Sequence, residues 1–145
     1  MATMKDILAI KGSQVLSISP EAMAQEAAVR MKEHKVGSLL VMSGGAMVGI
    51  VTERDILHRV VVPQCDPCAT PVHEIMTSEV ACCQLNTSVE EARGVMKNRR
   101  LRHLPVLDEA DQLCGMVSIG DLNAHDAHDQ ELTIHVLREY ISGRA

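Results

Sequence analysis

The stretch that decides the fold is Gly49–Ile56, GIVTERDI, because the chain contains it a second time as Gly115–Leu122, GMVSIGDL, 66 residues further on. Each copy has a glycine, two apolar residues, a Ser or Thr, and an Asp three residues after that hydroxyl. An apolar run followed by Ser/Thr-x-x-Asp is the pattern of a strand that leads into a capped helix. The sequence therefore predicts an internal duplication.

The duplication continues upstream of this stretch. Val36–Val41 (VGSLLV) aligns with Leu101–Val106 (LRHLPV) at an offset of 65, and Met31 aligns with Met96 at the same offset. The change of offset from 65 to 66 means that the second copy carries one extra residue. We place it in Leu107–Gln112, because polar turns tolerate insertions.

Both copies are typical of a β-α-β-β-α module. The first has expected strands at 14–18, 37–42 and 47–51, and helices at 23–34 and from 52 onward. The second has expected strands at 80–84, 104–107 and 113–117, and helices at 88–98 and from 118 onward. In the second copy Thr87 and Glu90 form a predicted capping box. A module of about 60 residues buries its sheet poorly alone, so we expect the two to pack on each other in a mixed α/β (α+β) fold.

The predicted boundaries are module 1 at 8–62, a proline-rich linker at 63–75, module 2 at 76–124, and a tail at 125–145. In the tail an apolar stripe from Leu132 to Ile141 has helical spacing. The tail is therefore expected to form a long C-terminal helix, and its stripe to contact another subunit or the body of the protein.

The composition excludes several classes of function. The 145 residues are 46% hydrophobic, with 14 Lys+Arg against 19 Asp+Glu, one Tyr, and no Phe or Trp. A net charge of −5 without stacking aromatics argues against a nucleic-acid partner and against a membrane surface. No segment reaches the roughly 18 apolar residues of a membrane span. Five cysteines and no apolar leader predict a cytoplasmic protein rather than a disulfide framework.

The paired motifs Thr52-x-x-Asp55 and Ser118-x-x-Asp121 have two interpretations. As structural elements they are capping boxes with Asp in place of Glu. As a binding device, a helix N-terminus offers free amides to an anion, and an Asp in its first turn can accept hydrogen bonds from a ribose diol. A duplicated module duplicates its caps, so the recurrence alone leaves both interpretations open.

The doubled motif, together with Met76-Thr77 and Arg102–Val106, resembles the cystathionine-β-synthase (CBS) domain family over nearly the whole chain. The resemblance implies two tandem modules in a pseudo-twofold pair, with two clefts that hold adenosine ligands such as AMP, ADP, ATP or S-adenosylmethionine. It also implies a small stand-alone regulatory protein without catalytic activity. The expected function is therefore adenosine-nucleotide sensing by a homodimer.

The resemblance also implies roles for individual residues. Asp55 and Asp121 would bind ribose hydroxyls, and Thr52 and Ser118 the ribose or α-phosphate. The adenine would lie near Lys11–Leu16 in one cleft and near Thr77–Ala81 in the other. The expected phosphate ligands are Arg54, Arg102 and His103.

The two copies differ where the second has Arg102-His103, because the first has Gly37-Ser38 at those positions. We therefore expect the cleft with Ser118 and Asp121 to hold Arg102 and His103 and to be the better nucleotide site, since charge-assisted contacts to phosphate are strong.

The remaining candidates are weaker. Cys65 and Cys68 form a lone C-x-x-C in the linker, and His125 and His128 are spaced like helix-borne metal ligands. Neither group supplies four zinc ligands, and we expect no resident metal or required cofactor. No Ser/His/Asp or Cys/His arrangement predicts an enzyme. The alternative function is a structural or metal-responsive dimerisation module with empty clefts.

Overall fold

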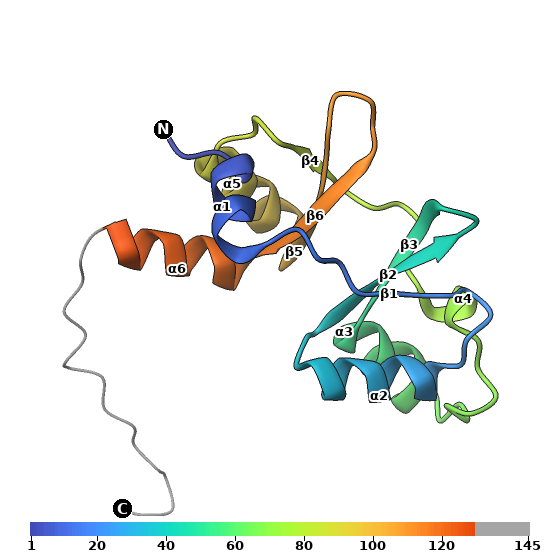
Figure 1. The fold of residues 1–145 in the computed structure, drawn as a ribbon. Helices are drawn as coiled ribbons and strands as arrows, with labels where there is room; N and C mark the ends of the chain where they lie inside the picture. The colour runs from blue at the N-terminus through green and yellow to red at the C-terminus, as the bar shows by residue number, and fades with distance from the viewer. Residues whose placement is uncertain (130–145) are drawn as a thin grey trace, which may run out of the picture.

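The computed structural model describes residues 1–129, which form two halves with one three-stranded sheet each (Figure 1). The first half contains β1 (Ser17–Ile18), α2 (Ala24–His34), β2 (Ser38–Ser43), β3 (Ala46–Thr52), α3 (Glu53–Ile56), the π-helix η1 (Leu57–Val61) and α4 (Val72–Ile75). The second half contains β4 (Cys83–Gln84), α5 (Val89–Arg99), β5 (His103–Leu107), β6 (Leu113–Ser118) and α6 (Ile119–Asp129). This order confirms the mixed fold of two β-α-β-β-α modules.

The two sheets have the same topology and the same irregularity. In each, a short first strand runs parallel to the second, and the second and third strands form an antiparallel hairpin. The pairing shifts between Val41 and Met42 in one hairpin and between Val106 and Leu107 in the other, which are equivalent positions at an offset of 65. The two copies therefore share the same backbone irregularity as well as the same sequence pattern.

The hairpin turns explain the change of offset. The first turn passes through Gly44 and Gly45, whose φ values of 58° and 83° are those that a tight hairpin needs. The second turn is longer by one residue between paired positions and is closed by Asp108, whose Oδ1 accepts hydrogen bonds from the amides of Ala110 (2.8 Å) and Gln112 (2.9 Å). The extra residue lies in this polar turn, as predicted.

The helix before the first strand belongs to the second half. In α1 (Met4–Lys11) the side chains of Met4, Ile7 and Leu8 are buried in the second hydrophobic core, and α1 packs against β6 and α6. Figure 1 shows α1 beside α5 and α6, away from the strands that follow it in the chain. In the first half, α4 packs against the equivalent strand β3. Residues 8–11, expected in the first module, therefore pack with the second.

The segment 63–75, expected as a linker, ends in a helix. Val72 and Ile75 of α4 are 0% and 2% exposed and join the first hydrophobic core. The amide of Val72 donates to the carbonyl of Ala22 at 2.7 Å, which attaches α4 beside the start of α2. Only the part of this segment before α4 lacks a helix or strand among the described residues.

One local prediction was wrong. The N-cap of α5 is Ser88, whose Oγ accepts from the amide of Glu91 at 3.0 Å, while Glu91 accepts from the amide of Ser88 at 3.0 Å. Thr87 lies one residue too early, and its hydroxyl accepts from the amide of Gln84 at 2.9 Å instead. The helix expected from residue 52 onward is present, as α3 followed directly by the π-helix η1.

Within residues 1–129 no helix combines the length and the apolar character needed to cross a bilayer. The last described residues of the chain lie in α6, which covers the first part of the predicted C-terminal helix. The apolar stripe from Leu132 to Ile141 lies outside the described residues.

Candidate functional site

A cavity of about 710 Å³ lies between the two halves. The first half contributes residues of β3, α3 and η1, and the second contributes residues 77–81 and 99–103. This volume is within the range of small-molecule binding sites. The cavity therefore has walls from both copies of the repeat, with the Thr52-x-x-Asp55 motif on one side.

The Asp55 side chain is fixed by the cap of α3. Its Oδ2 accepts from the amide of Thr52 at 2.9 Å and from the Thr52 hydroxyl at 3.2 Å, and the Asp55 amide donates to that hydroxyl oxygen at 3.2 Å. The Asp55 residue is only 9% exposed. The cap thus holds a carboxylate in one orientation at the cavity wall, so the structural and the ligand-binding interpretations of the motif are compatible.

Arg59 contacts both Asp55 in the cavity wall and the backbone of residues 75–76, which lead into the second half. Its Nη1 donates to the carbonyls of Ile75 and Met76, both at 3.2 Å, and its Nε lies 3.9 Å from Oδ1 of Asp55. Arg59 lies on the π-helix η1, and such turns are frequent at functional sites. The guanidinium therefore sets the position of both the carboxylate and the neighbouring backbone.

Close backbone contact forms the floor between the halves. The amide of Ile50 donates to the carbonyl of Thr77 at 3.0 Å, and the amide of Thr77 donates back to Ile50 at 2.9 Å. Gly49 permits this approach, because a Cβ at that position would lie 2.7 Å from Sδ of Met76 and 2.9 Å from the Thr77 carbonyl oxygen.

The cavity is rich in cationic side chains. Its lining includes five arginines against three carboxylates. The arginines are Arg54, Arg59, Arg99, Arg100 and Arg102, and the acidic residues are Glu53, Asp55 and Glu79. In a chain with net charge −5, this local excess of positive charge favours an anionic ligand.

The second motif, Ser118-x-x-Asp121, has a different partner. Oδ2 of Asp121 accepts from the Ser118 amide at 2.8 Å and from Nζ of Lys11 at 2.6 Å, and Lys11 also donates to the carbonyl of Met116 at 2.7 Å. Burial raises the pKa of the Asp121 carboxyl, but the hydrogen bonds from Lys11 and Ser118 outweigh burial and leave this pKa below its usual value. Lys11 is therefore part of the second motif's surroundings.

The basic residues expected beside Ser118 and Asp121 lie at the boundary of both motifs, since the amide of Ile119 donates to the carbonyl of Arg102 at 2.9 Å. Arg102 and His103 line the cavity of Thr52 and Asp55 rather than grouping solely with Ser118 and Asp121. His103 pairs with Ser118 between β5 and β6, so it lies at the boundary of both motifs. An internal repeat shows which residues are equivalent, but the packing of the two halves decides which motif a side chain faces.

His103 lies in a mixed electrostatic environment. Burial lowers the pKa of its imidazole below the ordinary value of 6.5, and the charge of Arg102 acts in the same direction. Asp121 and Glu53 raise this pKa, but by less. The imidazole is therefore poised toward the neutral form, in which it can accept as well as donate a hydrogen bond.

The other predicted site residues divide into two groups. Arg54, Thr77 and Gly37, all candidate ligand-binding residues, line the cavity. Ser38 does not line it, because it is 4% exposed and pairs with Thr52 inside the first sheet. Ser38 is therefore part of the framework that carries Thr52.

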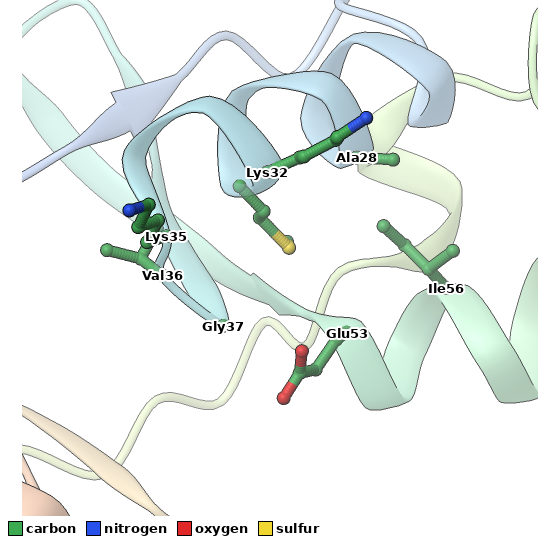
Figure 2. A pocket seen from close by; sticks show the side chains of 8 residues that line it. Ala28, Lys32, Lys35, Val36, Gly37, Glu53 and Ile56 are labelled. Atoms are coloured by element: carbon green, nitrogen blue, oxygen red, sulfur yellow. The ribbon is translucent and has the colours of Figure 1, made fainter.

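A second hollow of about 540 Å³ lies on the outer side of the first half, between α2 and α3. Figure 2 shows the carboxylate of Glu53 directed toward Gly37, with Lys32 and Lys35 on the opposite wall. A Cβ at Gly37 would lie 3.0 Å from Oε1 of Glu53, so the glycine makes room for this carboxylate. Glu53 and Gly37 line both this hollow and the larger cavity, so the two are adjacent.

Sequence reasoning missed several lining residues, namely His58, Arg59, Arg99 and Arg100. The available signal was the basic run 97–102, which is also explained by favourable charge at a helix C-terminus. The chain turns at the end of α5, where Arg100 adopts a left-handed conformation with φ 56°. Residues 99–102 of the basic run line the cavity at this turn.

The candidate metal ligands are not assembled among the described residues. Cys65 and Cys68 are exposed free thiols, and residues 1–129 contain no cluster of three or more His, Cys, Asp or Glu side chains placed to hold an ion. The side chain of His128 lies outside the described ones. A metal-responsive role for the C-x-x-C stays a prediction.

Comparison with known proteins identifies the two halves. A family model described as CBS domain matches residues 4–62 and 72–127. A CBS domain-containing protein of Bacillus subtilis, YhcV, is 38% identical over 122 residues, which cover 84% of this chain and 84% of the relative.

Solved structures show the same fold. A putative signal-transduction protein with CBS domains from Burkholderia ambifaria has a TM-score of 0.87 and 38% identity, with 92% of this chain and 99% of that chain covered. The CBS domain pair of protein MJ0100, solved with 5′-methylthioadenosine and S-adenosyl-L-methionine, has a TM-score of 0.78 at 22% identity, over 89% of this chain and 98% of that pair, and this likeness concerns the fold alone. From the doubled motif, the two matched segments and these relatives it follows that the chain belongs to the CBS domain family, as a tandem pair of CBS modules.

Proposed function

We propose that the cavity between the two modules binds an adenosine nucleotide and that the chain is a regulatory, non-catalytic sensor of that ligand. CBS domain pairs are regulatory ligand-binding modules. The observation that carries the proposal is one cavity in which a cap-oriented carboxylate, Asp55, lies among five arginines. A carboxylate suits a ribose diol, and arginines suit phosphates.

The walls suit an adenine without aromatic stacking. The chain has no Phe or Trp, so a base must rest on aliphatic side chains and on backbone. The cavity offers Ile50, Val80 and Ala81 as apolar lining and the Thr77 segment as adjacent backbone. The base would therefore lie toward residues 77–81, with the phosphates toward residues 99–103.

The positive charge of the cavity lining predicts an order of affinity among the family's adenosine ligands. Arginine–phosphate hydrogen bonds are about twice as strong as neutral ones, whereas the sulfonium of S-adenosylmethionine brings a further positive charge to a cationic cavity. We therefore infer that phosphorylated ligands bind in preference to S-adenosylmethionine, and that added salt weakens binding by screening the arginines.

Calorimetry on ligand-free protein tests this proposal. We expect ATP, ADP and AMP to bind, each at least about tenfold more tightly than adenosine or S-adenosylmethionine. Arg102→Gln should reduce this preference, and Lys32→Gln, in the outer hollow, should leave it unchanged. The absence of heat with all five ligands, on protein shown to be ligand-free, would refute nucleotide binding.

We also propose a homodimer, which would place two pairs side by side. Four apolar side chains on α2 and around η1 are 42–68% exposed, namely Val29, Leu57, Val61 and Val62. Exposed apolar side chains of this size favour burial against a second copy. We expect light scattering to give twice the chain mass, and a mass of one chain at micromolar concentration would contradict the dimer.

A further inference from the structure

The Glu53 side chain lines the cationic cavity without a partner of its own. Its carboxylate takes part in no hydrogen bond or ion pair with any of residues 1–129. Asp55, in the same cavity, is held by the amide of Thr52 and lies 3.9 Å from Nε of Arg59. The negative charge of Glu53 is therefore not paired with a neighbouring cation, and it acts on any charged ligand in the cavity.

The fold does not require an acidic side chain at this position. Glu53 begins α3, where a negative charge is favourable in general. The equivalent residue of the second module is Ile119, which begins α6 directly after Ser118. In both modules the capping carboxylate belongs to the Asp two residues further on, namely Asp55 and Asp121. The repeat therefore forms its helix start with or without a carboxylate at the position of Glu53.

Glu53 lies within electrostatic reach of residues 99–103. Its charge raises the pKa of the His103 imidazole, which belongs to that segment. The amide of Glu53 donates to the carbonyl of Gly37 at 3.0 Å, and Figure 2 shows the carboxylate directed toward this glycine, which has no Cβ to obstruct it. The third acidic residue of the lining, Glu79, belongs instead to residues 77–81, where the base would lie.

We propose that Glu53 selects against nucleotides with more than one phosphate, so that the ligand of this cavity is a nucleoside monophosphate. This inference rests on the proposed function, which places the ribose at Asp55 and the phosphates toward residues 99–103. In that orientation the α-phosphate lies beside the ribose, and the β- and γ-phosphates extend among side chains that include Glu53. The arginines attract each added phosphate, but Glu53 repels it and offsets the gain.

Calorimetry with AMP and ATP tests the role of Glu53 in the full chain. The buffer is free of magnesium, because bound Mg²⁺ would neutralise part of the phosphate charge. We expect AMP to bind the unmodified chain at least as tightly as ATP. In Glu53→Gln the affinity for ATP should rise about tenfold and that for AMP about twofold or less, so that ATP becomes the preferred ligand. Tighter binding of ATP than of AMP to the unmodified chain would overturn the proposal.

Glu79→Gln is the matched control, because it removes the same charge from the same cavity at the other segment. It should change the affinities for AMP and ATP by one common factor of about two or less. Glu53→Ala, which has no amide that could itself bind a phosphate, should repeat the rise for ATP.

The outcomes separate this proposal from the proposed function. An equal gain for ATP in Glu79→Gln and Glu53→Gln would mean that total charge, and not the position of Glu53, sets the preference, and would overturn the role of Glu53. An unchanged ratio of the two affinities in Glu53→Gln would overturn it as well, while nucleotide binding stands. If neither AMP nor ATP binds the ligand-free unmodified chain, the proposed function itself fails.

Discussion

Gly49→Ala is expected to lower the free energy of unfolding by about 3 kcal/mol, the upper end of the usual cost of overpacking. The added Cβ would lie 2.9 Å from the carbonyl oxygen of Thr77, which is backbone and is fixed by its pairing with Ile50. It would also lie 2.7 Å from Sδ of Met76. Relief requires β3 and the Thr77 segment to separate, which breaks the two backbone hydrogen bonds between Ile50 and Thr77.

Two other glycines provide matched controls. At Gly115, the equivalent position, the nearest atoms are the terminal methyls of Leu8, at 2.8 and 3.0 Å, and these can move aside. Gly115→Ala should therefore cost about 1 kcal/mol. At Gly94, inside α5, a Cβ meets nothing within 4 Å, and alanine should stabilise the helix by up to about 1 kcal/mol.

Urea denaturation of the three variants measures these differences from the midpoint at constant slope. A larger loss for Gly115→Ala than for Gly49→Ala would show that the contact of β3 with Thr77 is not what fixes the packing of the halves.

The fold was predictable because its main signals are local. The hairpins follow from alternating runs around glycine-rich or polar turns, and the helices follow from apolar spacing. Because the sequence repeats, a helix or strand predicted in one copy could also be predicted at the equivalent position of the other. The capping box of α5 was displaced by one residue, because Thr87 and Ser88 both offer a hydroxyl and both have a Glu three residues later.

Backbone conformations that are not marked by a characteristic residue, such as glycine or proline, could not be predicted. Lys35 and Arg100 end α2 and α5 with the same left-handed φ of 56°, although glycine is the usual residue there. The π-helix η1 follows α3 without any proline or glycine, and it brings Arg59 to Asp55. These features depend on tertiary packing, which a single sequence does not express.

The residues of the site could largely be identified from the sequence, but which of them lie together in the fold could not. The Thr52 and Asp55 motif, Arg54 and the Thr77 segment were identified from sequence, and all line one cavity. Arg102 was assigned to the motif of its own module, but the packing of the halves also places it in the cavity of Thr52 and Asp55. Lys11 was not paired with Asp121, because α1 precedes the first module in the chain but packs on the second. The packing of α1 on the second module alone decides where Lys11 lies.

Asp55→Ala is expected to weaken nucleotide binding about 100-fold, the loss of roughly two hydrogen bonds to a charged acceptor. Asp55 is the cap-oriented carboxylate of the arginine-rich cavity, so Asp55→Ala should weaken binding more than Asp121→Ala, whose carboxylate is already paired with Lys11. This order reverses the one that the repeat suggested. Calorimetry with ATP measures both variants.

The capping role of Asp55 must be separated from its binding role, and α1 offers the control. Asp6 forms the same box, since its Oδ2 accepts from the amide of Thr3 at 2.9 Å and from the Thr3 hydroxyl at 3.4 Å, but it does not line the cavity. Asp6→Ala should cost stability by about 1 kcal/mol, as Asp55→Ala does through its cap, and leave the affinity unchanged. If Asp6→Ala weakened ATP as much as Asp55→Ala, the effect of Asp55 would be one of folding. Asp55→Asn, which keeps an oxygen for the Thr52 amide and loses the charge, should retain the cap and still bind ATP at least about tenfold more weakly.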